Sequence, residues 1–395
     1  MNTPKPVSET RLHHQFMSIF LVAYMAYAVS YTMLLPYLAS LGYTSSERGL
    51  ILSGTAVIAM IGQFLFGFLC DKYKTVKKMY VLTTILFIIL VYLAYSVTQA
   101  AFFFHLITIS LMGGFFRIVV GLLDSWTIER DPILQKNYGV IRAFGSIGWI
   151  IGSPLTVMIL NRSGYGSFAL WVAVLSILTL IIGSTLGDAQ KVVHQAPIKL
   201  SDIKLLLRKK QYLVLVTILF IINITLYADA YTIVDKILKL GGTNADISNK
   251  WVIQALCELP LFFFGSLVYK RFSAKTLLMV GIFMFGVRFL LSAFANSAVQ
   301  LVWIALTQLV TFPFILLSSK MLINDESPGH LKSTGQLLGL ALYTGLSALV
   351  SPLISGFLVD AIGTDNTLLF FAGLCLVPLV LGLWYRTMKP AYDLD

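Results

Sequence analysis

A few charged residues lie inside long apolar stretches of the sequence, and these are the residues whose types could do chemistry. They are Arg117, Asp124, Arg142, Asp229, Glu258, Arg288 and Lys320. A charge at the centre of a bilayer costs about 2.5–3.5 kcal/mol even on insertion scales. We therefore expect each of these side chains to face a partner or a water-filled cavity.

The charges of the first half are spaced as a binding site would require. Arg117 and Asp124 lie two turns apart on one helical face, and Arg142 opens the next helix, within reach of Asp124. Such a pair can bind substrate hydroxyl groups, and Trp149, two turns beyond Arg142, can stack on a sugar or another planar ligand. A structural ion pair and a core tryptophan explain the same residues equally well.

The charges of the second half are of the types that carry protons. A carboxyl group in a poorly solvated cavity, here Asp229 or Glu258, can hold a proton near neutral pH, and an arginine such as Arg288 can help release it. Salt bridges between neighbouring helices are the alternative. Gln308 is an uncharged polar residue within a span, either a ligand contact or an interhelical hydrogen bond.

A stripe of tyrosines follows the first apolar run. Tyr24, Tyr27 and Tyr31 are spaced by three and four residues and share one face of a helix. Tyr27 and Tyr31 are candidate substrate contacts, with ordinary packing as the alternative. The three cysteines form no metal-binding pattern, and no nucleophile–base set or phosphate loop stands out, so we expect no metal, no cofactor and no enzymatic activity.

The elements that position these residues are transmembrane helices. The chain is 57% hydrophobic and only 12% charged, with a mean hydropathy of +0.83, whereas soluble domains are roughly 25% charged. Long apolar runs without period-two alternation indicate helices. We predict twelve spans at about 15–40, 48–70, 78–98, 100–123, 139–161, 167–187, 212–238, 247–269, 275–295, 298–322, 333–359 and 366–387.

The basic residues set the expected orientation. The net charge of +11 could suggest nucleic acid, but most lysines and arginines fall in short loops on one side of the predicted membrane. The loops on the other, external side contain Arg48, Arg162, Lys236, Lys239 and Lys250. We expect a multi-pass protein of the cytoplasmic membrane, a monomer in the lipid bilayer, with both termini cytoplasmic and no nucleic-acid partner.

The longest polar interruption divides the chain. We predict an N-terminal six-helix bundle over 1–190, a cytoplasmic linker over 191–211 and a C-terminal six-helix bundle over 212–395. The basic second part of the linker could also lie on the inner leaflet. The second predicted helix ends in a run that contains Gly67, Asp71 and Lys72. A similar Gly–xxx–Tyr–Lys run recurs at the matching place in the second half.

These motifs resemble the major facilitator superfamily, and within it the lactose permease-like oligosaccharide:proton symporters. The Gly67–Asp71–Lys72 loop is similar to the superfamily's gating loop, with Lys74 where a glycine is usual. The run from Tyr138 to Trp149 resembles the permease segment whose arginine binds galactoside hydroxyls and whose tryptophan stacks on the ring. In that register Asp124 falls on the substrate-binding glutamate and Arg288 on an arginine linked to proton coupling.

The resemblance weakens in the tenth helix. Where the family has a lysine, a histidine and a glutamate, this chain has Ala305, Gln308 and Thr311. The eighth-helix glutamate of the family falls on Ala255, and Glu258 lies one turn away. The resemblance therefore supports the sugar site better than the proton mechanism.

Together these features predict an all-α membrane protein with the major facilitator fold: twelve transmembrane helices in two pseudo-symmetric six-helix bundles around a central cavity. We expect secondary transport of a small polar solute, favouring a sugar or glycoside, by alternating access and proton symport. An exporter of drugs or lipid-linked compounds and a symporter of nucleosides or aromatic acids are the rivals on the same fold. A non-transporting membrane sensor is the alternative from another class.

Overall fold

The computed structural model describes residues 9–189, 200–328 and 331–388, and within them every regular element is a helix. Ten helical stretches are long and apolar enough to cross a membrane. One of them, Thr334–Thr387, contains a break at Gly363, whose φ of 80° ends one helix and starts another. With α11 (Asn244–Arg271) added, the twelve predicted spans are all present as helices.

The first six spans contain α1 to α8. Their bounds are α1 Glu9–Tyr31, α2 Leu34–Ser40, α3 Ser45–Tyr73, α4 Lys77–Ser96, α5 Phe102–Arg130, α6 Pro132–Lys136, α7 Tyr138–Ser163 and α8 Phe168–Ser184. A short 3₁₀ turn, η1 (Tyr165–Ser167), joins α7 to α8.

The last six spans follow α9 (Leu200–Arg208). Their bounds are α10 Lys210–Lys239, α11 Asn244–Arg271, α12 Ala274–Ala293, α13 Ala298–Ile304, η2 Ala305–Val310, α14 Phe312–Glu326, α15 Lys332–Leu340, η4 Ala341–Gly345, α16 Leu346–Leu374 and α17 Leu376–Thr387. Of the predicted linker 191–211, residues 191–199 lie outside the described residues.

The chain packs into two compact units. Unit 1 comprises 1–37 and 57–193, and unit 2 comprises 38–56 and 194–395. The segment 38–56 precedes the linker in sequence but packs within unit 2. Helix α3 is continuous from Ser45 to Tyr73, so it contributes its first turns to unit 2 and the remainder to unit 1.

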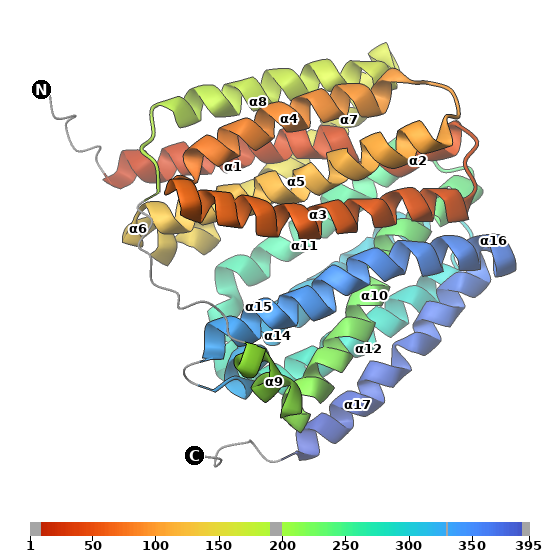
Figure 1. The fold of residues 1–395 in the computed structure, drawn as a ribbon. Helices are drawn as coiled ribbons and strands as arrows, with labels where there is room; N and C mark the ends of the chain where they lie inside the picture. The colour runs from red at the N-terminus through yellow and green to blue at the C-terminus, as the bar shows by residue number, and fades with distance from the viewer. Residues whose placement is uncertain (1–8, 190–199, 329–330, 389–395) are drawn as a thin grey trace, which may run out of the picture. The chain divides into compact units, whose positions relative to one another are not determined.

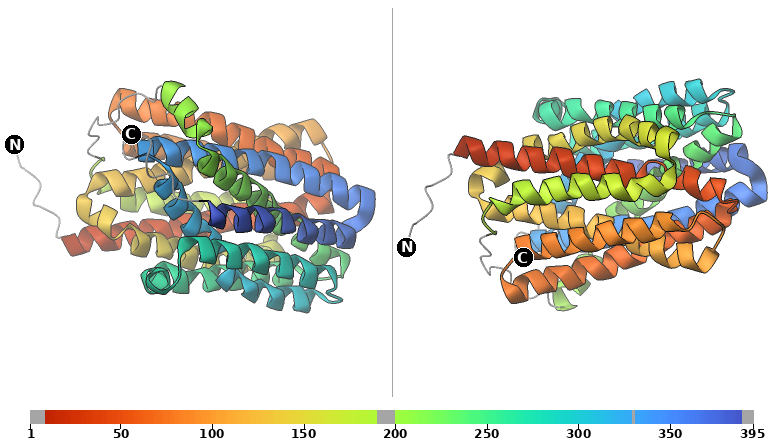
Figure 2. Two further views of the ribbon diagram at one scale, coloured as in Figure 1. Left: turned by 90° about the horizontal axis from the view of Figure 1, so that it is seen from below. Right: turned by 90° about the horizontal axis from the view of Figure 1, so that it is seen from above.

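In unit 1, the first helix is covered by the fifth and sixth spans. Helix α1 lies against α7 and α8, and α4 lies against α5 and α8 (Figure 1). The view from above shows α1 in red running beside α8 in yellow-green (Figure 2, right). Gly148 allows the closest approach, because a Cβ there would meet the carbonyl oxygen of Leu21 at 2.2 Å.

Unit 2 repeats these pairings. Its first span, α10, lies against α16 and α17, and α12 lies against α14, α16 and α17. Two serine hydroxyls of α16 bond to α10 backbone carbonyls, from Ser347 to Phe220 at 2.9 Å and from Ser351 to Ile224 at 2.6 Å. The same order of packing in both units is the internal repeat that the matching loops in the sequence predict.

The tenth span is not a regular α-helix. It runs through α13, then the 3₁₀ segment η2, and resumes as α14 after Thr311, with Pro313 near the start of α14. A 3₁₀ stretch in the middle of a span weakens the backbone ladder and often marks a functional position. Gln308 is carried by this segment.

The predicted gating loop lies at the end of α3. Asp71 and Lys72 are exposed in its last turn, and a Cβ added at Gly67 would meet no atom within 4 Å. Lys74, which stands where the superfamily motif has glycine, has a φ of 49°. This left-handed conformation costs little for glycine, which explains why the motif prefers glycine there.

Candidate functional site

Asp124 and Arg142 come together in unit 1, as their spacing predicts. Asp124 is carried by α5 and Arg142 by the first turns of α7, and Arg142 Nε lies 4.0 Å from Asp124 Oδ1. Their side chains are 30% and 32% exposed, so this is a half-open pair and not a core salt bridge. Asp124 also interacts with the phenol of Tyr138 at the start of α7.

Tyrosines of α1 form the wall beside this pair. The guanidinium of Arg142 lies over the ring of Tyr24, 4.4 Å from its centroid. The Tyr24 hydroxyl is buried and makes no hydrogen bond within the described part of the chain. Tyr27 packs edge-on against Tyr24 and Phe116, and Tyr31 stacks on Phe116 with centroids 5.4 Å apart. The predicted tyrosine stripe is therefore largely an aromatic core adjoining the charged pair.

The other predicted contacts of the first half are placed less specifically. Trp149 is half-buried on α7, two turns beyond Arg142, and Arg117 is half-buried on α5, two turns before Asp124. The glycines of α7 explain how its charged face is held beside α1. Gly145 lies so close to α1 that a Cβ there would meet the Tyr24 ring at 3.0 Å.

The predicted coupling residues of the second half meet in one buried network. Arg288 of α12 donates from Nη2 to Asp229 Oδ2 at 2.8 Å and from Nη1 to Gln308 Oε1 at 2.6 Å. Gln308 Nε2 in turn donates to Glu258 Oε1 at 3.0 Å. Gln308, predicted as either a substrate contact or an interhelical hydrogen bond, joins Arg288 to Glu258 in the structure.

The chemistry of Arg288 settles the orientation of the Gln308 amide. A guanidinium only donates hydrogen bonds, so the amide must present its oxygen to Arg288 and its NH₂ group to Glu258. The link is therefore directional, from the cation through a neutral amide to the carboxylate.

Two members of this network were missed from the sequence. Lys250, assigned there to an external loop, is fully buried in α11, 3.7 Å from Asp229 Oδ2. Gln254, also buried, donates to the same oxygen at 3.2 Å. The signal was present in the spacing, because Lys250, Gln254 and Glu258 recur every four residues along one face of α11.

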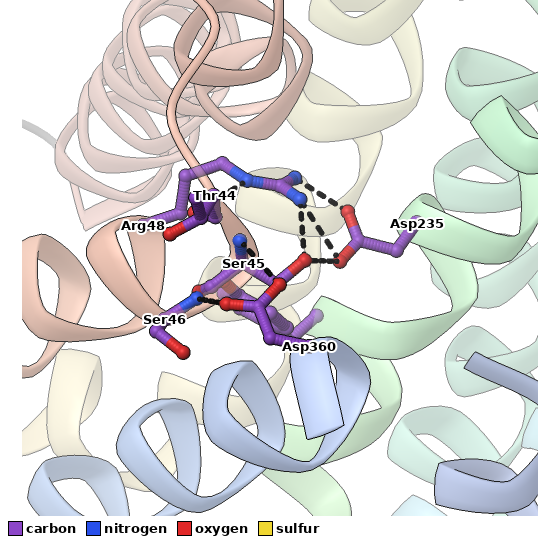
Figure 3. Close-up of polar contacts among 7 residues, drawn as sticks. Thr44, Ser45, Ser46, Arg48, Asp235 and Asp360 are labelled. Carbon is purple, nitrogen blue, oxygen red and sulfur yellow. Dashed lines mark hydrogen bonds and ion pairs between the residues drawn. The ribbon is translucent and has the colours of Figure 1, made fainter. Parts of the chain in front are cut away.

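A second polar cluster in unit 2 holds the first turn of α3 (Figure 3). Arg48 Nη1 lies 2.5 Å from Asp235 Oδ1, and Arg48 Nη2 donates to Asp235 Oδ2 at 3.2 Å. Asp360 of α16 accepts from the backbone amides of Ser45 and Ser46 at 3.1 and 2.7 Å, so its carboxylate caps the helix N-terminus. From the sequence, Arg48 is predicted to lie in an external loop, and no role is predicted for either aspartate.

Similarity to known proteins shows the family to which this chain belongs. The model of the MFS_1-like family matches residues 14–371. The chain belongs to this family of major facilitator transporters. It is therefore a multi-pass membrane transporter and not an enzyme, as the sequence predicts.

Individual relatives have low sequence identity to this chain, but the alignments cover most of both proteins. The lactose permease of Klebsiella oxytoca is 22% identical over 385 residues, covering 88% of this chain and 89% of that protein. The putative nucleoside transporter YegT of Escherichia coli is 23% identical over 350 residues, covering 82% and 79%. A solved structure of the nucleoside transporter NupG superposes with a TM-score of 0.82 at 18% identity, covering 95% of this chain and 99% of that one.

Proposed function

We propose that this transporter moves a sugar or glycoside across the cytoplasmic membrane by symport with protons. The observation that carries the proposal is the half-open pair of Asp124 and Arg142 beside the Tyr24 ring. Arg142 Nε lies 4.0 Å from Asp124 Oδ1, and both side chains remain partly exposed, so a ligand can reach the carboxylate and the guanidinium together. Adjacent substrate hydroxyls can donate to the carboxylate and accept from the guanidinium.

The relatives favour the same class of substrate. Sucrose and raffinose permeases of Escherichia coli match 88% of this chain, at 22% and 21% identity. Trp149 remains the proposed stacking partner for the apolar face of the sugar ring. The side chain of Asp124 is one methylene shorter than that of glutamate, so the proposal does not identify lactose as the substrate.

The buried network of unit 2 is the proposed proton-coupling device. Asp229, Glu258 and Arg288 would act together, with Gln308 transmitting the state of one carboxyl group to the other. Glu258 is the proposed proton carrier, because the hydrogen bonds that link it to Arg288 run through the neutral amide of Gln308, whereas Asp229 bonds Arg288 directly. The loop of Gly67, Asp71 and Lys72 is the proposed gate, both termini are proposed to be cytoplasmic, and the transporter is proposed to act as a monomer.

A nucleoside is the second candidate substrate. Nucleoside and xanthosine transporters of Escherichia coli are among the relatives, and the aromatic wall formed by Tyr24, Tyr27 and Tyr31 suits a planar base. A nucleoside also offers ribose hydroxyls to the Asp124–Arg142 pair, so the site chemistry alone does not separate the two classes.

Uptake into proteoliposomes separates the candidates. The purified protein is reconstituted, the outside is acidified, and labelled lactose, sucrose, uridine, phenylpropionate and a hydrophobic cation are offered separately. The proposal expects a sugar to accumulate, with accumulation abolished by a protonophore and by Arg142→Met. Accumulation of uridine alone selects the nucleoside symporter. Movement of the hydrophobic cation alone selects an exporter and rejects the sugar site.

A further inference from the structure

Lys250 is buried in a way that its present contacts do not explain. Its side chain has no exposed surface, and its ammonium lies 3.8 Å from the centroid of the Trp251 ring and 3.7 Å from Asp229 Oδ2. Within the described part of the chain, Nζ makes no hydrogen bond. Burying an ammonium that makes no hydrogen bond is costly, so the carboxylate at 3.7 Å and the Trp251 ring satisfy Lys250 only in part.

Asp229 also has a buried polar atom that makes no hydrogen bond within the described part of the chain. Arg288, Gln254 and Lys250 all approach the same oxygen, Oδ2, at 2.8, 3.2 and 3.7 Å. The other oxygen, Oδ1, is buried and accepts no hydrogen bond from the described residues. An unused acceptor and an unused cationic donor therefore lie beside each other.

Arg288 is the group that could change partners. Its two terminal nitrogens already serve the two ends of the network, with Nη2 on Asp229 and Nη1 on Gln308, which bonds Glu258. A shift of Arg288 towards Glu258 would leave the Asp229 carboxylate without its guanidinium. An unpaired buried carboxylate is strongly destabilising, so the shift needs a second cation near Asp229.

We propose that Lys250 is this second cation: a positioning residue that bonds Asp229 Oδ1 whenever Arg288 moves to Glu258. The inference rests on the proposed proton coupling. When Glu258 loses its proton to water, two carboxylates face Arg288 and Lys250, and each takes one cation, so the network is neutral. When Glu258 regains a proton, Arg288 returns to Asp229 and Lys250 retreats to the Trp251 ring.

The first test compares two modes of transport in proteoliposomes, using labelled sucrose and uridine as probes. Exchange at equal pH does not require Glu258 to lose its proton, whereas accumulation driven by a pH gradient does. Lys250→Met is expected to slow accumulation at least about tenfold and to leave exchange within about threefold of wild type. Lys270→Met, an exposed lysine on the same helix, is the matched control.

A merely structural ion pair would give a different pattern. It would lower both transport modes in parallel with the amount of folded protein, and that result overturns the proposal. Unchanged accumulation in Lys250→Met also overturns it.

The second test needs no transported probe, so it separates failure of this inference from failure of the proposed function. Thermal unfolding is measured in detergent for Arg288→Met and for Arg288→Met combined with Lys250→Met. Lys250 is expected to pair with Asp229 in the single variant, so the double variant unfolds several degrees lower, and adding Asp229→Asn reverses the loss. Equal unfolding temperatures for the single and double variants reject the counter-ion role. If this cycle holds while the wild type moves neither probe, the proposed substrates are wrong and the counter-ion role of Lys250 stands.

Discussion

Arg48 of α3 and Asp235 of α10 are 187 positions apart in the sequence and form a bidentate ion pair in unit 2. The two side chains are only 8% and 5% exposed. Ser45 completes the group, because its hydroxyl accepts from Arg48 at 2.8 Å and donates to Asp235 at 3.2 Å. A buried ion pair therefore holds the first turns of α3 to α10, and each charge is neutralised by the other.

Breaking this pair on one side is expected to destabilise unit 2. Arg48→Met leaves the Asp235 carboxylate buried without its cation, which costs about 3–5 kcal/mol. The free energy of unfolding can be measured by titrating the micellar protein with dodecyl sulfate. Asp235→Asn added to Arg48→Met should recover most of the loss. Lys239→Met is the control, since the Lys239–Asp365 pair is 53% and 45% exposed and contributes less than about 1 kcal/mol.

The docking of α3 on α16 should be equally sensitive to added volume. A Cβ on Gly356 would lie 2.3 Å from the carbonyl oxygen of Ser45, which is backbone and cannot step aside. Gly356→Ala is therefore expected to cost about 1–3 kcal/mol in the same titration. Gly373→Ala, beyond the break of α16 at Gly363 and with no atom within 4 Å of its Cβ, should leave stability unchanged or raise it slightly. Equal effects of the two substitutions would contradict the close packing.

The substrate pair can be tested without removing a charge. Arg142→Lys keeps the cation beside Asp124 but loses the planar fork that binds two hydroxyl oxygens at once. The apparent affinity for the transported sugar should fall by about tenfold or more, about 1.4 kcal/mol, while the unfolding temperature stays constant. Arg162→Lys, an exposed arginine at the end of the same helix, serves as control. An unaltered affinity would remove Arg142 from the binding site.

Gln308 should behave as a connector. Gln308→Leu has a similar size but breaks both the bond to Arg288 and the bond to Glu258. We expect proton movement to uncouple from substrate movement, so that exchange continues and accumulation falls at least about tenfold. Simultaneous recording of internal pH and label uptake measures the ratio. A normal proton-to-substrate ratio in Gln308→Leu would show that the link carries no coupling.

The connection between α8 and α4 should respond to acid. Asp188 accepts hydrogen bonds from the backbone amides of Val76 and Lys77 at 3.0 and 2.8 Å and from the Thr75 hydroxyl. Burial alone would raise the pKa of Asp188, but these bonds outweigh it and hold the pKa below its ordinary value of 3.8.

A lowered carboxyl pKa stabilises the folded state above the unfolded pKa, and the benefit disappears as the pH falls through the folded pKa. Asp188→Asn should therefore lower the unfolding temperature at pH 7. The difference from wild type should shrink steadily below about pH 4. A difference that is independent of pH would mean that Asp188 acts through its shape and not its charge.

Local patterns predicted the spans and the contact between Asp124 and Arg142. Asp124 and Arg142 are brought together because each lies on a helix next to the other in the chain, so spacing along two consecutive helices was sufficient. Asp229, Glu258, Arg288 and Gln308 were each singled out as polar residues inside apolar helices. Their order of contact, in which Gln308 stands between Arg288 and Glu258, was not predictable.

By itself, the sequence determined that this chain crosses a membrane many times and which few side chains break the apolar rule. Both follow from local properties, since about 20 consecutive apolar residues suffice to span a bilayer and any charge among them is conspicuous. Only the tertiary structure decided which charges are partners. Arg48 and Lys250 looked like loop residues because they lie near helix ends, yet packing buries them against Asp235 and Asp229. Such pairings depend on how distant helices pack, and helix periodicity carries no information about the partner helix.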